Sequence, residues 1–381
     1  MMISSSDADI LRARLARLVA RGRVPGAQLA VRQGGALAFS AAAGVARGFR
    51  ESEEIDAVPA QEDTPFAVFS AGKPVVATAI ALCEERGVLD AERPVAAYFP
   101  EFARAGKRAI TIVDVLTHRS GILLPGLSGT PALWRDRERV TAALADAAPT
   151  FRRGTLAYAP LEYGWILGEV VRRAAGISLT EFVEREISAP LGLTSLRFGA
   201  RGRAHGSIAR PYWLGGAQRV AGHDISRTFE AVNDSPDFLE AEVPGAGLVT
   251  DARSLASFYD FWLRRGYTPA GRRLLSDTTV TRTLRLHAFG FDRSNRAPLA
   301  VARGFLLGTR LPSVYGFWGT QRCFGHAGAF STIAFADPER DLAVALVTNG
   351  NRGRRALLTE LMPVVDAVRR TVRSRHTPRV E

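Results

Sequence analysis

Ser70 and Lys73 stand three positions apart at the start of an apolar stretch, Val75 to Leu82, that predicts a helix. On a helix, positions i and i+3 share a face, so the Lys73 amine is expected to lie over the Ser70 hydroxyl. The helix N-terminus adds unpaired N–H groups and the positive end of the helix dipole, which favour negative charge beside Ser70. The spacing therefore predicts a serine nucleophile with an adjacent proton acceptor.

Lysine is rare in this chain. Lys73 and Lys107 are its two lysines, and its other basic residues are arginines. A lysine amine can give up its proton when its surroundings lower its pKa, whereas a guanidinium cannot. We therefore interpret Lys73 as a position that requires an amine able to act as a base.

Tyr158 lies in the loop sequence Gly154 to Pro160, directly before a predicted helix. A tyrosine in that place can reach into a cleft, and a nearby ammonium could depress its pKa so that it takes or relays a proton. Taken alone, the residue leaves a packing role with a satisfied hydroxyl as the alternative.

The sequence Gly325-His326-Ala327-Gly328-Ala329 opens a predicted late strand. Its small residues would let a substrate lie along the strand, and the N–H of Ala329 could point at an oxyanion. His326 could donate a hydrogen bond or carry partial positive charge. A plain turn residue is the alternative that His326 alone leaves open.

The elements that must position these residues follow from hydrophobic periodicity and turn signals. The first part of the chain predicts a helix at 7–23, strands at 27–32 and 36–41 joined by a turn at 33–35, and the Ser70 helix to about 86. Helical segments follow at 112–116, 134–148, 163–175 and 179–187. The last part predicts a strand at 247–249, a helix at 254–264, strands at 324–330, 332–336 and 342–348, and a closing helix at 354–373. This order indicates a mixed sheet built from both chain ends with a helical insertion between them.

Ser-x-x-Lys at a helix start, a tyrosine after a helical insertion and His-Ala-Gly opening a late strand, in that order, resemble the serine β-lactamase and penicillin-binding-protein superfamily. The similarity is greatest to its esterase-like branch, which includes class C β-lactamases, family VIII carboxylesterases, D-aminopeptidases and related acyltransferases. It covers residues from about 10 to 370. The supporting phrases are Val24-Pro25-Gly26-Ala27, Leu116-Thr117-His118-Arg119-Ser120-Gly121, Tyr163-Gly164-Trp165, Gly245-Ala246-Gly247-Leu248 and Asp337-Pro338-Glu339.

The resemblance implies a β-lactamase/transpeptidase-like α/β fold, with a central antiparallel sheet flanked by helices and an all-helical domain. We assign residues 1–75 and 236–381 to the sheet domain and 76–235 to the helical insertion, with the cleft between them. The resemblance also implies that Ser70 is acylated, that Lys73 takes its proton, and that Tyr158 shares the base work and protonates the leaving group. The N–H groups of Ser70 and Ala329 would form the oxyanion hole, with His326 and Gly328 beside the substrate, while His118 is expected to be structural.

Two departures from the family pattern bear on the substrate. The second motif is often Tyr-x-Asn, but Pro160 takes the place of the asparagine and offers no side-chain hydrogen bond. The third motif is usually Lys-Thr-Gly, but His326 replaces the lysine with a group that is mostly neutral near pH 7. Both changes point away from β-lactams and cell-wall peptides and toward a small-molecule ester, thioester or amide.

The sequence therefore predicts a serine hydrolase that acts on a carboxylic ester or amide through an acyl-enzyme on Ser70. One alternative is a transacylase that passes the acyl group to an amine or alcohol in a natural-product pathway. The other is a catalytically idle homologue that binds a ligand. No cofactor or metal is expected. Candidate linings of the cleft are the aromatic residues Tyr212, Trp213, Phe317 and Trp318.

Composition limits the other possibilities. The net charge is +12, but the arginines are mixed with 38 acidic residues and form no basic–aromatic array, so we expect no nucleic-acid partner. No stretch of about eighteen apolar residues predicts a membrane span, and the N-terminal residues do not resemble a signal peptide, so we expect a cytoplasmic protein. Cys83 and Cys323 are too few for a disulfide framework, although their pairing stays open.

Overall fold

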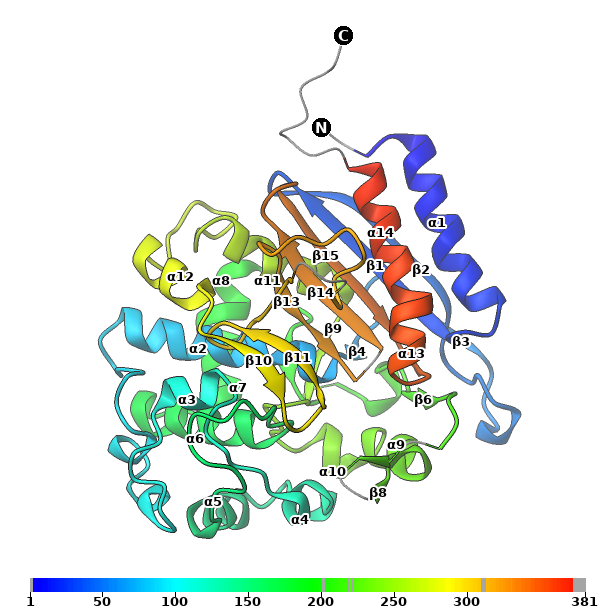
Figure 1. The fold of residues 1–381 in the computed structure, drawn as a ribbon. Coiled ribbons are helices and arrows are strands. Elements are labelled where there is room, and N and C mark those ends of the chain that lie inside the picture. The colour runs from blue at the N-terminus through cyan, green and yellow to red at the C-terminus, as the bar shows by residue number, and fades with distance from the viewer. Residues whose placement is uncertain are drawn as a thin grey trace.

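The computed structural model describes residues 3–200, 203–217, 219–220, 223–309, 313–329 and 331–372 of the chain. Its centre is a nine-stranded antiparallel sheet in the order β10-β11-β12-β13-β14-β15-β1-β2-β3 (Figure 1). Its strands come from the two ends of the chain, as the sequence predicts. They are β1 (Gly26–Gln33), β2 (Ala36–Arg47), β3 (Val58–Pro59), β10 (Ala288–Asp292), β11 (Ala297–Val301), β12 (Leu306–Leu307), β13 (Phe324–Gly328), β14 (Thr332–Asp337) and β15 (Leu342–Thr348).

The central strands are apolar on both sides because helices cover both faces of the sheet. On β1, Leu29 and Val31 belong to the core under α1 (Ser5–Ala20) and α14 (Met362–Thr371), whereas Ala30 faces the opposite core. Strand β15 repeats this alternation, with its alanines on the side of α2 (Lys73–Glu85) and α11 (Ala252–Leu263). Small side chains there let α11 approach the sheet closely.

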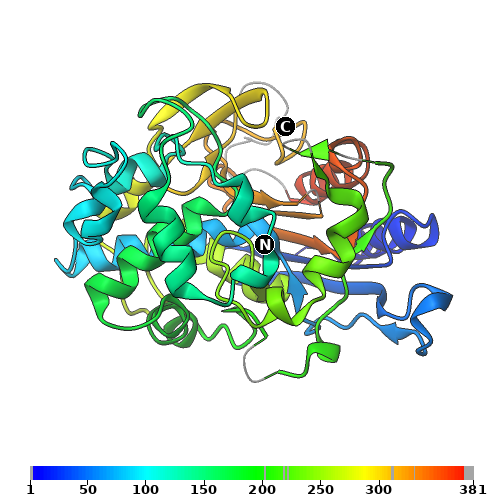
Figure 2. The same cartoon turned by 90° about the horizontal axis from the view of Figure 1, so that it is seen from below.

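The middle of the chain forms the helices that lie on the α2 side of the sheet. Figure 2 shows most of them in cyan and green, on the side away from α1 in blue and α14 in red, with one light-green helix nearer to the red helices. These helices are α3 (Ile112–Leu116), α4 (Pro125–Ser128), α5 (Arg137–Asp146), α6 (Glu162–Ala175), α7 (Leu179–Val183), α8 (Ala189–Leu191), α9 (Ile225–Asn233) and α10 (Pro236–Leu239). Helix α12 (Asp277–Leu284) follows α11, and α13 (Arg354–Ala356) runs through the π-helical turn Leu357–Leu361 into α14.

Short strands join these two regions. β4 (Phe66–Ala67) and β5 (Arg197–Phe198) pair with either side of β9 (Leu248–Thr250), and β6 (Tyr212–Trp213) pairs with β16 (Gly350–Asn351). β7 (Arg219–Val220) and β8 (His223–Asp224) form a separate pair. Strands β5 and β6 belong to the assigned insertion but pair with the sheet domain's segments. The boundaries 1–75, 76–235 and 236–381 stay a prediction.

The hairpin between β1 and β2 shows why the sequence signal at 33–35 was informative. Gln33 pairs with Ala36, which leaves Gly34 and Gly35 as the two turn residues. Both have positive φ, 62° and 85°, as a tight hairpin of matching twist requires and as glycine adopts without strain. The predicted turn is confirmed.

Two features differ from the sequence prediction. Ser70 lies in a 3₁₀ turn, Phe69–Gly72, and α2 begins only at Lys73. The β10–β11 hairpin was not predicted, because its exposed and partly buried residues give a weak strand pattern. Residues 330 and 373, the predicted ends of a strand and of the closing helix, lie outside the described residues.

The two thiols lie apart. Cys83 and Cys323 are both free and buried, and they belong to the cores on opposite faces of the sheet. In the described part of the chain, no helix has the length and apolar character needed to cross a membrane.

Packing of α1 on the sheet makes a test of this fold. Leu15 on α1 is 1% exposed, whereas Ile10 on the same helix is 49% exposed. We expect Leu15→Ala to lower the free energy of unfolding by about 2–5 kcal/mol, because the substitution leaves a cavity. Ile10→Ala should change it by less than about 0.5 kcal/mol. Urea unfolding followed by circular dichroism measures both, and equal effects would contradict the packing described here.

Candidate active site

Ser70 and Lys73 lie together where a 3₁₀ turn runs into α2. The Ser70 Oγ–Lys73 Nζ distance is 3.0 Å. A 3₁₀ turn has three residues per turn, so side chains three apart eclipse one another. The preceding residue, Phe69, has a positive φ of 50°, a strained conformation for a residue with a bulky side chain. This backbone geometry sets the half-buried Ser70 beside the amine.

The Lys73 side chain is fully buried and makes two further hydrogen bonds. Its Nζ donates to the backbone carbonyl of Pro160 at 2.7 Å and to that of Gly245 at 2.8 Å. Burial lowers the pKa of Lys73 to about 7, because the charged form loses its hydration, while the nearby Glu162 carboxylate acts in the opposite direction. The amine is thus partly neutral at physiological pH.

Glu162 is a buried counter-charge that the sequence analysis did not single out. Its Oε1 accepts from the Leu124 N–H at 2.7 Å and from the Ser128 hydroxyl at 3.0 Å, which fixes the carboxylate at the start of α6. These two donors satisfy the hydrogen-bonding capacity of a carboxylate that is shielded from water. The one signal in the sequence is an acidic residue in the first turn of a helix, a common feature of helices.

Pro160 keeps a contact with Lys73 without an asparagine side chain. The second motif holds the amine through the Pro160 carbonyl, a backbone group that every residue type provides. Proline in place of asparagine therefore removes a side-chain donor that could face a substrate. The backbone acceptor for the Lys73 amine is kept.

Tyr158 lies beside both residues. Its hydroxyl is hydrogen-bonded to Ser70, and its ring centroid is 5.0 Å from Lys73 Nζ. Burial is the main influence on its pKa, which rises well above the usual value despite the Ser70 hydrogen bond. The depression of its pKa that a nearby ammonium could cause is not found: burial raises the pKa instead, and the phenol keeps its proton.

Two buried residues from distant segments hold the Tyr158 loop. Asp292 on β10 accepts a hydrogen bond from the Tyr158 N–H at 2.8 Å. His118 accepts from the Ala159 N–H through Nδ1 at 3.1 Å, and its ring lies 4.4 Å from the Tyr158 ring, centroid to centroid. The expectation of a structural His118 stays a prediction, and this geometry supports it. Sequence analysis missed Asp292, since its contact depends on the unpredicted hairpin.

Strand β13 runs past the Ser70 turn at close distance. A Cβ added to Gly328 would lie 2.0 Å from the carbonyl oxygen of Val68, so a glycine is required there. Ala329 follows with a positive φ of 39°. Within the described residues, neither its N–H nor that of Ser70 has a hydrogen-bond acceptor. Both N–H groups are therefore available as donors, one on Ser70 and one on the residue that follows Gly328.

His326 is buried near Tyr158, with 6.0 Å between ring centroids. Burial, followed by the Lys73 charge, lowers its pKa to about 3, so the ring is neutral. Its Nδ1 lies 2.6 Å from the Ala327 carbonyl oxygen. A carbonyl only accepts, so we assign the hydrogen to Nδ1 and an unshared pair to Nε2, which has no partner among the described residues. The neutral ring agrees with the expectation of a mostly neutral group at this position, and the alternative of a partial positive charge on His326 is not supported.

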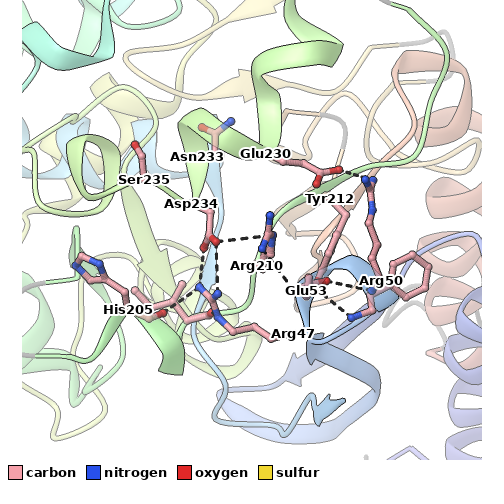
Figure 3. A network of polar contacts seen from close by, with 12 residues as sticks. Arg47, Arg50, Glu53, His205, Arg210, Tyr212, Glu230, Asn233, Asp234 and Ser235 are labelled. Carbon is pink, nitrogen blue, oxygen red and sulfur yellow. Dashed lines mark hydrogen bonds and ion pairs between the residues drawn. The ribbon is translucent and has the colours of Figure 1, made fainter. Parts of the chain in front are cut away.

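The four aromatic residues expected to line the cleft have other environments. The Tyr212 hydroxyl donates to Glu53 at 2.7 Å, inside the polar network of Figure 3 that joins the β2 side of the sheet to residues 205–235. Trp213 packs on Phe229. The Phe317 and Trp318 side chains are exposed, and their N–H groups donate to Asp366 on α14, across the sheet from α2.

Comparisons with known proteins agree with this geometry. A family model described as Beta-lactamase matches residues 11–366. The chain is 32% identical over 316 residues to "Esterase/beta-lactamase LipL" of Mycobacterium tuberculosis, covering 77% of this chain and 71% of that protein. It is 33% identical over 217 residues to "Esterase EstB" of Burkholderia gladioli, covering 51% and 53% of the two chains. A penicillin-binding protein homologue from Caulobacter crescentus superposes with a TM-score of 0.83 at 27% identity, over 98% of this chain and 99% of its own. This likeness confirms the predicted β-lactamase/transpeptidase-like fold.

The scarcity of lysine allows a direct test of the Lys73 pKa. Protein labelled with [ε-¹³C]lysine should give two NMR signals, from Lys73 and Lys107. We expect the signal that disappears in Lys73→Arg to titrate with a midpoint near pH 7. A midpoint close to 10 would contradict the desolvation of this amine.

Proposed function

The chain belongs to the beta-lactamase family, and from this premise we propose that it is a serine hydrolase that cleaves a small carboxylic ester through an acyl-enzyme on Ser70. Lys73 is the base, Tyr158 carries the proton to the leaving group, and the N–H groups of Ser70 and Ala329 bind the oxyanion. His326 and Gly328 lie beside the acyl group. The names of LipL and EstB, which both contain the word esterase, support the substrate class.

The hydrogen bonds of Lys73 Nζ are the main support for its role as the base. A neutral amine has two hydrogens and one unshared pair arranged tetrahedrally around the nitrogen. The carbonyls of Pro160 and Gly245 accept the two hydrogens, so the unshared pair is directed at the remaining neighbour, Ser70 Oγ at 3.0 Å. Because the pKa of Lys73 is about 7, a large fraction of the enzyme holds this base ready at neutral pH.

Acylation then uses Ser70, Lys73, Tyr158 and the two N–H donors. Ser70 Oγ attacks the ester carbonyl as its proton passes to Lys73, and the carbonyl π electrons move to the oxygen between the two N–H donors. When the tetrahedral intermediate collapses, the C–O bond to the alcohol breaks and the Tyr158 hydroxyl protonates the departing oxygen. Lys73 returns the proton to Tyr158. The site is again neutral, with Ser70 acylated.

Deacylation repeats these steps with water as the nucleophile. Water gives its proton to the same base and releases the carboxylic acid from Ser70. An ester is favoured over β-lactams and peptide C-termini, because the buried neutral His326 cannot pair with a carboxylate as a lysine would. A catalytically idle homologue is disfavoured, because Ser70, Lys73 and Tyr158 are in mutual contact.

Mass spectrometry of the intact protein tests the nucleophile and the acceptor together. With p-nitrophenyl butyrate, we expect nitrophenol release and a butyryl adduct on Ser70 that clears in water. Ser70→Ala should form no adduct. The control Ser257→Ala should behave as the wild type, because it removes only a hydroxyl that donates a hydrogen bond to the Arg253 carbonyl on α11. An adduct that persists until an amine or alcohol is added would make the protein a transacylase instead.

A second prediction concerns the base. We expect kcat/KM for the ester to rise with pH to a plateau, with a midpoint near 7, because only neutral Lys73 accepts the proton. Lys73→Arg keeps the positive charge but cannot supply a base, so its kcat should fall by about 10²–10⁴-fold. Thermal unfolding of the variant controls for folding. A variant with full turnover would rule out Lys73 as the base.

A further inference from the structure

Helices α1 and α14 lie side by side on the face of the sheet opposite α2 (Figure 1). A groove lies between α1 and the α13–α14 segment on this face. Its volume is about 580 Å³, within the range of about 300–1,000 Å³ that is usual for small-molecule sites. Apolar side chains, among them Leu18 and Val364, form part of its walls. The active-site residues Ser70, Lys73 and Tyr158 do not line it.

The charges in this groove are strongly unbalanced. Among the described residues, Glu360 is its one acidic side chain, and it pairs with Arg23 at 3.2 Å and with Arg352 at 3.5 Å. The other arginines of the groove have no ion pair or side-chain hydrogen bond to any described residue. They are Arg14 and Arg17 on α1, Arg21 directly after α1, and Arg355 on α13.

These four arginines differ from other exposed arginines in that they share one concave space. Many of the chain's other arginines are paired with carboxylates, including Arg172 and Arg173 with Glu169 and Arg265 with Asp277. Unpaired guanidinium groups that share a concave space repel one another, and an anion between them relieves the repulsion. A planar guanidinium group can donate two parallel hydrogen bonds to phosphate oxygens. Several guanidinium groups in one groove therefore favour a ligand with closely spaced phosphate groups.

We infer that this groove, which we call the arginine groove, is a second ligand site that binds a compound with two or more adjacent phosphate groups. The arginines on α1 hold the anion from one wall and Arg355 from the other. The site is separate from the ester-cleaving residues, so the inference does not depend on the proposed function. A free phosphorylated compound and a lipid headgroup share this chemistry.

Titration calorimetry with tripolyphosphate tests the free ligand. We expect one molecule to bind per chain, more weakly as ionic strength rises. The variant Arg17→Gln/Arg21→Gln/Arg355→Gln should bind at least tenfold more weakly. The matched control Arg108→Gln/Arg272→Gln/Arg322→Gln loses the same charge from exposed arginines whose side chains have no described partner, and it should stay within twofold of the wild type. Ser70→Ala should bind normally.

Cosedimentation with vesicles distinguishes the source of the phosphate groups. Binding to phosphatidylcholine vesicles that contain a prenyl diphosphate lipid, but not to vesicles of phosphatidylcholine alone, lost in the groove variant and kept in the control, would identify a lipid headgroup. Binding of tripolyphosphate alone would identify a free compound. Equal losses in both triple variants would overturn the inference, because net charge alone would explain them, as would failure of the wild type to bind either probe.

Discussion

The burial of one amine is the constraint on which the site depends. Lys73 is removed from water beneath Ser70, and desolvation brings its pKa to about 7. The same burial would be costly without partners, and the carbonyls of Pro160 and Gly245 provide them. Those two hydrogen bonds also orient the nitrogen. Burial and orientation together convert an ordinary lysine into a group that can take the serine proton.

Close packing between backbone segments holds this arrangement. A Cβ on Gly164 of α6 would lie 2.1 Å from the Gly245 nitrogen, and a Cβ on Gly328 would meet the Val68 carbonyl. Three segments distant in sequence therefore meet around Lys73 with no space for side chains between them. The loop that carries Tyr158 is held by hydrogen bonds from its backbone N–H groups to His118 and Asp292. Rigid placement of this kind keeps catalytic groups within hydrogen-bond reach of each other.

Charge is distributed differently on the two faces of the sheet. On the α2 side, buried groups are neutral or matched by a counter-charge, as His326 and the Glu162–Lys73 pair show. On the α1–α14 side, four arginines with no ion pair among the described residues share a groove with one carboxylate, Glu360. The net charge of +12 is thus concentrated in part at a defined groove, which composition alone cannot reveal. The esterase proposal and the arginine groove concern separate parts of the molecule.

The sequence by itself determined the family, the fold class and the order of most elements, because hydrophobic period, glycine turns and the Ser-x-x-Lys, Tyr and His-Ala-Gly phrases are local features. It also placed Ser70, Lys73 and Tyr158, which the structure brings into contact. Only the tertiary structure decided their protonation. The pKa of Tyr158 is raised and His326 is neutral, because desolvation depends on which distant segments cover a residue. The roles of Asp292 and Glu162 and the position of the arginine groove also depend on contacts between segments distant in sequence. The sequence alone therefore did not predict them.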